Sequence, residues 1–260
     1  MDENQEYVIL GKGVGFGKKV SQRFDKPEEC TMYRLAQETE RGSAKKLVKG
    51  IEPEYLEIAD AILTEAQKVF GESIDRGILF PLADHISFAV ARIRRNEQIS
   101  NPLTEDIKAL FYSEFKVAET LKTILKERLQ IEIDDHEVGY VALHIHSAIG
   151  DEKVSVAMQT ARAVRECIDM IEKATGKTID VLSLSYNRLM NHMKYMVARA
   201  STGEKLNLDM NEYMLDQYPQ AYEIAADICK NLEGGIGHKL DETEIGYLAM
   251  HIQRVYKDAV

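Results

Sequence analysis

Residues 134–145 read DDHEVGYVALHI, and residues 241–252 read DETEIGYLAMHI. The same offset of 107 positions relates His85 to His192. Over the 61 positions that begin at His85, 15 residues are identical to their counterparts in the second copy, without any gap. The chain is therefore predicted to contain two copies of one domain of about 100 residues, joined near Gly150.

Each copy has the periodicity of helices. Apolar residues recur at spacings of three and four along residues 107–129, and again along residues 210–232. Further helices are predicted from Pro53 to about Phe70, over Leu82–Ile93 and over Val156–Glu172. We therefore predict a mainly α fold with two tandem, duplicated helical-bundle domains, preceded by a short β segment.

Helix starts within each copy carry signals of their own. Asp134 with Glu137, and Asp241 with Glu244, have the spacing of a capping box, with a carboxylate at the N-cap and a glutamate three residues later. These boxes place the start of the last helix of each copy ten residues before the histidine that follows. Pro219 should begin a new helix rather than lie inside one.

Composition excludes several classes of protein. Of the 260 residues, 45% are apolar and 29% are charged, which is usual for soluble globular proteins. The chain has no apolar run of the roughly 18–20 residues that span a bilayer, and its acidic N-terminus lacks the pattern of a secretory signal. We therefore expect no membrane insertion and a cytoplasmic location. Cys30, Cys167 and Cys229 are far apart, which predicts reduced thiols and no metal site built on cysteine.

Charge is unevenly distributed along the chain. The net charge is −10, yet residues 1–50 hold 10 Lys and Arg against 8 Asp and Glu. Residues 7–24 contain four basic residues and no acidic ones, so this is the stretch that could attract nucleic acid. The competing interpretation is a solvated, charged strand.

Glycine alternates with larger residues in the same stretch. The alternating positions are Gly11, Lys12, Gly13, Val14, Gly15, Phe16, Gly17 and Lys18. A period of two predicts a strand with one bare face and one face of cationic, apolar and aromatic side chains. Such a face suits an RNA loop, whose bases stack on aromatic rings and whose phosphates attract cations. The spacing fits neither a P-loop nor a GxGxxG segment.

Four histidines occupy matching positions in the two copies. They are His85, His144, His192 and His251, and each is predicted to lie on a helix. An imidazole titrates near neutral pH and is nucleophilic when a polar neighbour orients its other nitrogen. The four are therefore predicted to be phosphorylation sites.

Polar residues flank the first histidine of each copy. Asp84 and Asn191 directly precede it, and Arg92 and Arg199 lie two helical turns after it. These residues are predicted to support a phosphoryl group, with the arginines as the nearest cations.

Other interpretations of the histidines remain open. A histidine beside an apolar helix face is often a packed, hydrogen-bonded residue. A metal site at His144 and His146 is disfavoured, because Gln253 replaces His146 in the second copy and alternate residues of a helix point apart. A hydrolase would need a nucleophile such as the serine of a GxSxG segment, which the chain lacks.

Several segments resemble members of one regulatory family. LADHISFA at residues 82–89, NPL at 101–103 and EVGYVALH at 137–144 resemble a phosphotransferase-system regulation domain (PRD), and IGYLAMH at 245–251 resembles its second copy. GKGVGFGKK at residues 11–19 resembles the later half of the small RNA-binding domain of BglG/LicT-family transcriptional antiterminators. The asparagine-rich first strand of that domain has no counterpart before Gly11, so a partial RNA-binding segment is expected.

The resemblance implies a sugar-responsive switch rather than an enzyme, with no cofactor. Family members bind an RNA hairpin as homodimers, and receive phosphoryl groups on the domain histidines from the phosphocarrier HPr or a sugar permease. The implied domains are residues 1–47 for RNA binding, 48–150 for the first PRD and 151–260 for the second. The alternatives are a phosphocarrier or phosphotransfer protein, and a fragment of a PRD-containing transcriptional activator.

Overall fold

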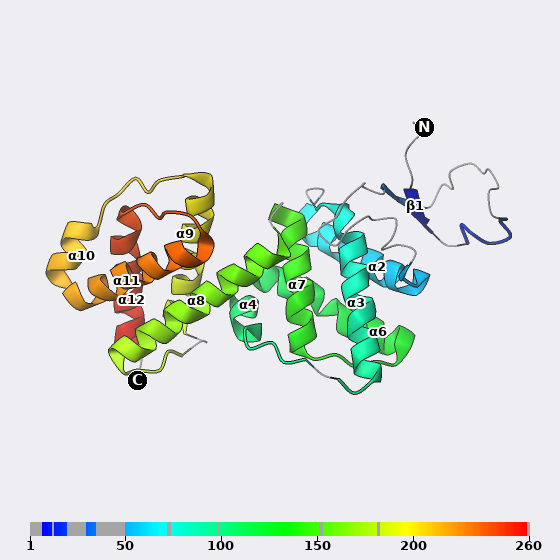
Figure 1. Ribbon diagram of the computed structural model, residues 1–260, viewed down its shortest axis with the longest axis horizontal. Helices are drawn as coiled ribbons and strands as arrows, with labels where there is room; N and C mark the ends of the chain where they lie inside the picture. Colours follow the sequence, from blue (N-terminus) through cyan, green and yellow to red (C-terminus); the bar gives the residue numbers. More distant parts are fainter. Residues whose placement is uncertain are drawn as a thin grey trace. The chain divides into compact units, whose positions relative to one another are not determined.

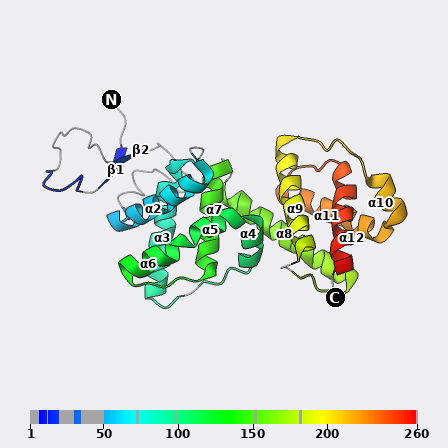
Figure 2. The same ribbon diagram turned by 180° about the vertical axis from the view of Figure 1, so that it is seen from behind.

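A computed structural model gives the fold of the chain (Figure 1; seen from behind in Figure 2). It describes residues 7–11, 13–19, 30–34, 50–71, 74–97, 99–150, 153–180 and 183–258. The chain forms two compact units, of which the first comprises residues 1–100 and 116–151 and the second residues 101–115 and 152–260. The predicted mainly α fold, with a short β region near the N-terminus, is confirmed.

Most elements of the two units are helices. The first unit contains strands β1 (Tyr7–Leu10) and β2 (Thr31–Arg34), the 3-10 helix η2 (Arg76–Ile78), and helices α2 (Pro53–Phe70), α3 (Leu79–Arg94), α6 (Thr120–Leu129) and α7 (Asp135–Gly150). The second contains α4 (Thr104–Leu110), α8 (Val154–Thr175), α9 (Leu184–Thr202), α10 (Asn211–Gln217), α11 (Pro219–Ile236) and α12 (Thr243–Asp258). Helix α5 (Tyr112–Ala118) runs through the point where the chain passes from the second unit back to the first.

The duplication is visible helix by helix. At the offset of 107, α2 corresponds to α8, α3 to α9, α4 to α10 and α7 to α12. Pro219 begins α11 as predicted, whereas the first-copy counterpart of α11 is divided into α5 and α6. The helical run predicted over residues 107–129 is thus broken, and Phe111 (φ −122°, ψ 48°) marks the first break.

Helices α2, α3 and α7 form the core of the first unit, and α3 and α7 run side by side (Figure 1). Leu82 and Ile86 of α3 and Val141 of α7 have no exposed surface. Each such side chain contributes about 1.5–3 kcal/mol of hydrophobic stabilisation. This packing holds α3 and α7, which carry the two histidines of the first copy, in a fixed register.

Segment 101–115 packs within the second unit, where α4 contacts α8 and α9. The Tyr186 hydroxyl of α9 lies 3.4 Å from Oδ1 of Asp106, and both residues are buried. Nζ of Lys194 donates to the carbonyl oxygen of Leu110 at 3.3 Å. Residues 101–115, which the predicted domain limits assign to the first PRD, thus lie in the second compact unit.

Helix α12 is central to the second unit and contacts α9, α10 and α11. Its close approach to α10 occurs at Gly246, whose backbone N–H donates to Oδ1 of Asn211 at 2.8 Å. The Asn211 amide also donates to the carbonyl oxygen of Glu242 at 2.9 Å. The close approach of α10 therefore explains why a glycine occupies position 246 in this copy.

Gly246→Ala is expected to lower the free energy of unfolding of the second unit by about 1–3 kcal/mol. A Cβ at this position would lie 2.7 Å from the carbonyl carbon of Met210, so the start of α10 would have to move. Hydrogen exchange of α12 peptides in the full chain measures the loss. Gly234→Ala in α11 is the control, because its Cβ would meet open space, and it should be neutral or stabilising by up to about 1 kcal/mol. Equal protection in the two variants would contradict the prediction.

The β region is an antiparallel hairpin in which Tyr7 pairs with Arg34 and Leu10 with Thr31. The strand predicted over residues 11–18 is wrong, because the strand ends at Leu10 and the glycine-rich stretch forms successive turns. Backbone N–H groups in this stretch donate to the carbonyl three residues earlier, as from Phe16 to Gly13 at 3.0 Å. Gly13 and Gly17 both have φ of +71°, which favours glycine and interrupts the alternation of a strand.

A tyrosine joins this hairpin to the helices of the first unit. The hydroxyl of Tyr33, a residue only 3% exposed, donates to Oδ1 of Asp60 in α2 and accepts from Nη2 of Arg76 at 2.7 Å. Arg76 also pairs with Asp60 at 2.6 Å. Burial and the hydrogen bond to Asp60 raise the pKa of Tyr33, so its hydroxyl keeps the proton that it donates. We call these three residues the Tyr33 latch.

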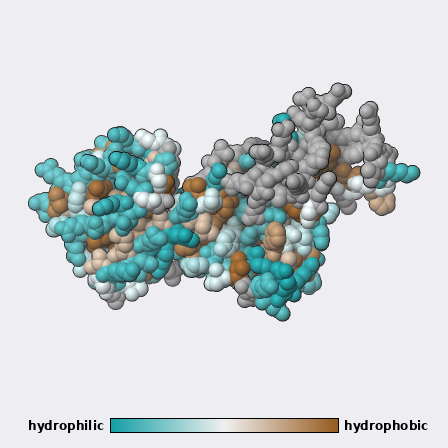
Figure 3. Space-filling view, in the orientation of Figure 1, coloured by the Kyte–Doolittle hydropathy of each residue, from teal (hydrophilic) through white to brown (hydrophobic). Residues whose placement is uncertain are grey.

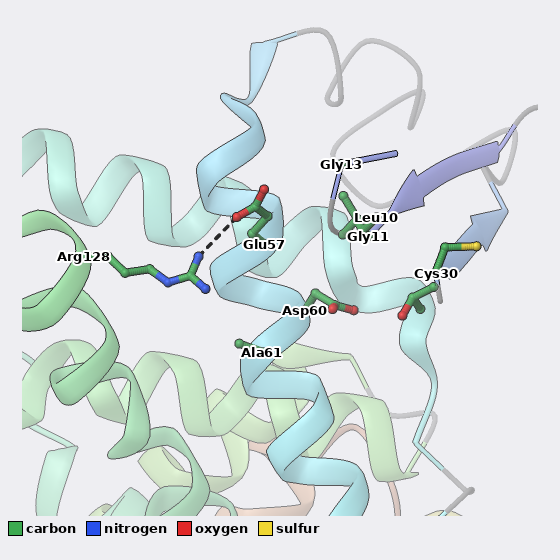
Figure 4. A pocket seen from close by; sticks show the side chains of 9 residues that line it. Leu10, Gly11, Gly13, Cys30, Glu57, Asp60, Ala61 and Arg128 are labelled. Carbon is green, nitrogen blue, oxygen red and sulfur yellow. Dashed lines mark hydrogen bonds and ion pairs between the residues drawn. The ribbon is translucent and has the colours of Figure 1, made fainter. Parts of the chain in front are cut away.

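Beside the latch, a polar pocket of about 670 Å³ separates the hairpin from the helices (Figure 4). Leu10, Gly11 and Cys30 line it from the hairpin side, and Glu57 lines it from α2. Arg128 of α6 reaches Glu57 at 3.3 Å. The hairpin and helices thus leave a solvent-accessible gap beside the Tyr33 latch.

The described surface is mostly polar on the face shown in Figure 3. On the face drawn in Figure 3, hydrophilic side chains predominate over the described parts, and hydrophobic ones form small, separate spots. Within the described ranges, no helix combines the length and apolar character needed to cross a bilayer.

Candidate functional site

The first histidine pair lies between α3 and α7. His85 of α3 and His144 of α7 have ring centroids 5.4 Å apart, and the Tyr140 ring is 5.7 Å from that of His85. Nε2 of His85 is 3.5 Å from Oε2 of Glu137, the long limit of a hydrogen bond. Arg92 donates from Nη2 to the other oxygen of that carboxylate at 2.7 Å.

The second pair repeats this arrangement between α9 and α12. The rings of His192 and His251 are stacked with centroids 4.8 Å apart, and Tyr247 stacks at 6.2 Å from His192. Nε2 of His192 is 3.8 Å from Oε2 of Glu244. Arg199 donates two hydrogen bonds to this carboxylate, at 2.6 and 2.8 Å. Each copy therefore joins its two histidines, which are 59 residues apart, into one site.

The glutamates of the expected capping boxes have different partners from those predicted. Oδ1 of Asp134 accepts from the backbone N–H of Glu137 at 3.2 Å, so the predicted N-cap is confirmed. The Glu137 and Glu244 side chains, however, accept hydrogen bonds from Arg92 and Arg199 instead of reaching back to the N-cap. A carboxylate that is 4% or less exposed is far more stable beside a guanidinium than alone, which explains the preference.

Sequence analysis missed these Arg–Glu pairs. The sequence predicts that Arg92 supports a phosphoryl group, whereas in the structure it binds Glu137. A signal was present, because an arginine and a glutamate of opposite charge are identical in both copies and 45 positions apart in each. Residues kept in both copies in this way are candidates for contact between the helices that carry them.

Burial sets the protonation of the second pair. Burial, together with smaller effects of the nearby His251 and Arg199, lowers the pKa of His192 to about 3. Burial, together with smaller effects of the positive charges of Arg254 and Arg188, lowers the pKa of His251 to about 4. Both imidazoles are therefore neutral at pH 7, and the 3.8 Å approach of His192 to Glu244 is not an ion pair. In the first pair, burial raises the pKa of Glu137, but the nearby His85 and the hydrogen bond from Arg92 outweigh burial and lower this pKa.

The other candidate residues directly precede the first histidine of each pair or belong to the glycine-rich stretch after β1. Asp84 is half-buried on α3 and Asn191 is exposed on α9. The described residues of the predicted RNA surface are all exposed in or beside the turns after β1: Gly11, Gly13, Gly15, Phe16 and Lys18. Phe16 is 90% exposed, and Lys12 lies outside the described residues. Among the described residues, no group of three His, Cys, Asp or Glu side chains could hold a metal ion.

Comparisons with known proteins identify the family of the two repeated domains. The PRD domain family matches residues 60–148 and 165–255. The GlcA/glcB genes antiterminator of Staphylococcus carnosus (strain TM300) is 30% identical over 96% of this chain and 89% of its own length. Transcription antiterminator LicT of Bacillus subtilis (strain 168) is 27% identical over 99% of this chain and 94% of its own. A crystal structure of GlcT CAT-PRDI matches 58% of this chain and 89% of its own, at 27% identity and a TM-score of 0.50.

Two duplicated helical domains, each with a histidine pair beside a buried Arg–Glu pair, define a regulatory protein of the PRD class rather than an enzyme. The chain belongs to the BglG/LicT family of transcriptional antiterminators, with two PRD domains.

Proposed function

We propose that the chain binds an RNA hairpin in the leader of a sugar-utilisation operon as a homodimer, and that phosphorylation of His85, His144, His192 and His251 switches this activity. The phosphoryl groups come from the sugar phosphotransferase system, through HPr and a sugar permease. The binding prevents an overlapping terminator hairpin from forming.

The equivalent histidine pairs carry this proposal. In both copies, two imidazoles from different helices meet at 4.8–5.4 Å beside an Arg–Glu pair. A histidine that only packs in the core does not require the same neighbours in both copies, namely a second imidazole, a tyrosine and an Arg–Glu pair. Two imidazoles that meet between helices in each copy, with those of the second unit neutral at pH 7, support a modification site.

Charge provides the mechanism of the switch. A phosphoryl group adds about −1.5 to −2 charges, and on Nε2 of His85 it would meet Glu137 at the present distance of 3.5 Å. Arg92 would then change partner from Glu137 to the phosphoryl group, and α3 and α7 would rearrange. Hydrogen bonds to charged groups contribute about 1.5–3 kcal/mol each. Shifting a two-state equilibrium from 1:99 to 99:1 needs about 5.5 kcal/mol. The new bonds to the phosphoryl group supply part of this difference, because the bond from Arg92 to Glu137 is lost in the exchange.

Phosphorylation in vitro tests the proposal. The chain is incubated with phosphoenolpyruvate, the first phosphotransferase-system enzyme, HPr and candidate permeases, and is then analysed by mass spectrometry at neutral to alkaline pH. We expect label on the four histidines and none on His136 or His238, which have no counterpart histidine in the other copy. Label confined to other residues, or no label with any donor, would reject the switch.

The exposed turns of the hairpin support the RNA-binding part of the proposal. Phe16 and Lys18 project from a stretch that has basic but no acidic residues, in a chain whose remainder is strongly acidic. An exposed aromatic ring beside cations can stack a base and neutralise its phosphates. A dimer would present two such loops to one RNA hairpin.

Phe16→Ala is expected to weaken binding of the tightest-binding leader hairpin by about 1–3 kcal/mol, because one stacked base loses its platform. Gel-shift or fluorescence titration of unphosphorylated protein gives the affinity. Lys18→Ala should instead reduce the slope of log affinity against log salt by about one. Phe88→Ala is the matched control, since Phe88 is an exposed phenylalanine of α3. Unchanged affinity without Phe16 would show that RNA binds elsewhere.

A further inference from the structure

Two arginines flank the second histidine of the second unit. Arg254 follows His251 by three residues on α12, so the two side chains share a helix face. Arg188 lies on α9, four residues before His192, whose ring stacks on that of His251. Both arginines are exposed, and both act electrostatically on the His251 ring.

These cations differ from the arginines described above. Arg92 and Arg199 are each held by a buried glutamate. In contrast, no carboxylate in the described parts of the chain pairs with Arg188 or Arg254. Two exposed arginines without acidic partners leave donors available for an anion.

The first copy provides an internal comparison. At the offset of 107, Arg188 corresponds to Pro81 and Arg254 to Ser147, so neither cation has a charged counterpart beside the first pair. The histidines, the tyrosine and the Arg–Glu pair are common to both copies, whereas these two arginines are specific to the second. They therefore serve something other than the shared architecture.

The two imidazoles of the second pair also differ in how a phosphoryl donor could reach them. Nε2 of His192 is buried and faces Glu244 at 3.8 Å, so a dianion there would contact a carboxylate. His251 is half-buried with Nδ1 inside, which leaves Nε2 as the nitrogen that a donor can reach. Arg254, which shares a helix face with His251, and Arg188 are then the cations that act on this ring.

We propose that His251 is the primary phosphoryl acceptor of the second unit, and that Arg254 and Arg188 are positioning residues that hold the phosphoryl group there. This inference rests on the proposed function and deepens it. In the transfer, a lone pair of Nε2 attacks phosphorus, and the bond between phosphorus and the donor nitrogen breaks. Its electron pair stays with the donor, and the imidazole proton ends on the leaving group or in water.

The test uses the full chain with two donors, phosphorylated HPr and phosphoramidate, a small molecule that transfers a phosphoryl group to histidine and releases ammonia. Label at each histidine is followed in time by mass spectrometry. We expect His251 to be labelled before His192 with both donors. Arg254→Gln should slow labelling of His251 about tenfold, the effect of losing one charge-assisted hydrogen bond, and the double variant with Arg188→Gln should slow it further. Arg254→Lys should restore most of the rate.

Controls separate this role from folding and from docking of the donor. Labelling of His85 and His144 should not change, and Arg162→Gln, at an exposed arginine of α8, should have no effect. An NMR titration should show a higher pKa for His251 in Arg254→Gln than in the unaltered chain, because a nearby cation is removed.

Three results would overturn the inference: faster labelling of His192, equal rates with and without the arginines, or dependence on the arginines with HPr alone, which would assign them to donor docking. If HPr labels no histidine while phosphoramidate labels His251 in an arginine-dependent way, the proposed function fails and the anion site stands.

Discussion

Arg199→Ala is expected to lower the free energy of unfolding of the second unit by about 3–5 kcal/mol. Glu244 is 2% exposed and Arg199 15%, so truncating the arginine leaves a carboxylate buried beside two neutral imidazoles. That carboxylate has lost its water and would have no cation in its place. Urea unfolding of the full chain, with hydrogen exchange of α9 and α12 peptides, measures the loss.

Two further variants test the cause of this loss. Lys205→Ala removes a surface pair with Asp241, where the lysine is 77% exposed, and should change stability by less than about 1 kcal/mol. Arg199→Met combined with Glu244→Gln removes both charges and should recover most of the stability, because no unpaired ion remains. A loss below about 1 kcal/mol for Arg199→Ala alone would mean that water reaches Glu244, and would contradict its burial.

Acid is expected to destabilise the second unit before the carboxylates titrate. The pKa values of His192 and His251 are lowered to about 3 and about 4 in the folded chain, while an unfolded histidine titrates near its ordinary value of about 6.5. Below pH 6.5 the unfolded chain binds more protons than the folded chain. The contribution of the two histidines to the free energy of unfolding is therefore fully present above about pH 6.5 and is lost as the pH falls. Each histidine contributes up to about 1.4 kcal/mol per pH unit, or roughly 2 kcal/mol by pH 5.

Urea midpoints measured between pH 7.5 and 5, with hydrogen exchange resolved for α9 and α12, check this dependence. His192→Asn and His251→Asn should each remove about half of the slope. Asp106 works in the opposite direction, because burial raises its pKa and the folded chain keeps that proton longer. A stability that stays flat down to pH 5 would show that the imidazoles are protonated in the folded chain.

The helical fold could be predicted from the sequence because the same pattern of apolar and capping residues occurs in both copies. The gapless offset predicted two equivalent helical domains with matching histidines, and the structure adds that the two histidines of each domain lie in contact. Capping residues and Pro219 also predicted helix starts closely, because these are local effects of a few residues.

The remaining features depend on tertiary contacts that no local pattern contains. The glycine-rich stretch has the period of a strand, yet positive φ at Gly13 and Gly17 turns it into a series of tight turns. Glu137 has the spacing of a capping residue, yet Arg92 on another helix competes for its carboxylate and wins. Periodicity also gave no sign that segment 101–115 would pack in the second unit, because α4 has the same amphipathic pattern whichever partner it covers.

The Tyr33 latch has a consequence for exchanging parts between relatives. The hydroxyl at position 33 belongs to the β-hairpin, whereas Asp60 and Arg76 belong to the helical part of the first unit. A chimera that joins the hairpin of one antiterminator to the PRD domains of another would therefore inherit half of this cluster from each parent. A hairpin without a tyrosine at this position would leave the Asp–Arg pair without its hydroxyl partner. A hairpin with the tyrosine, grafted onto helices that lack the Asp–Arg pair, would bury a hydroxyl with no hydrogen-bond partner. The boundary for recombination is thus set by three side chains, and the two parents need to match at those positions rather than in overall identity.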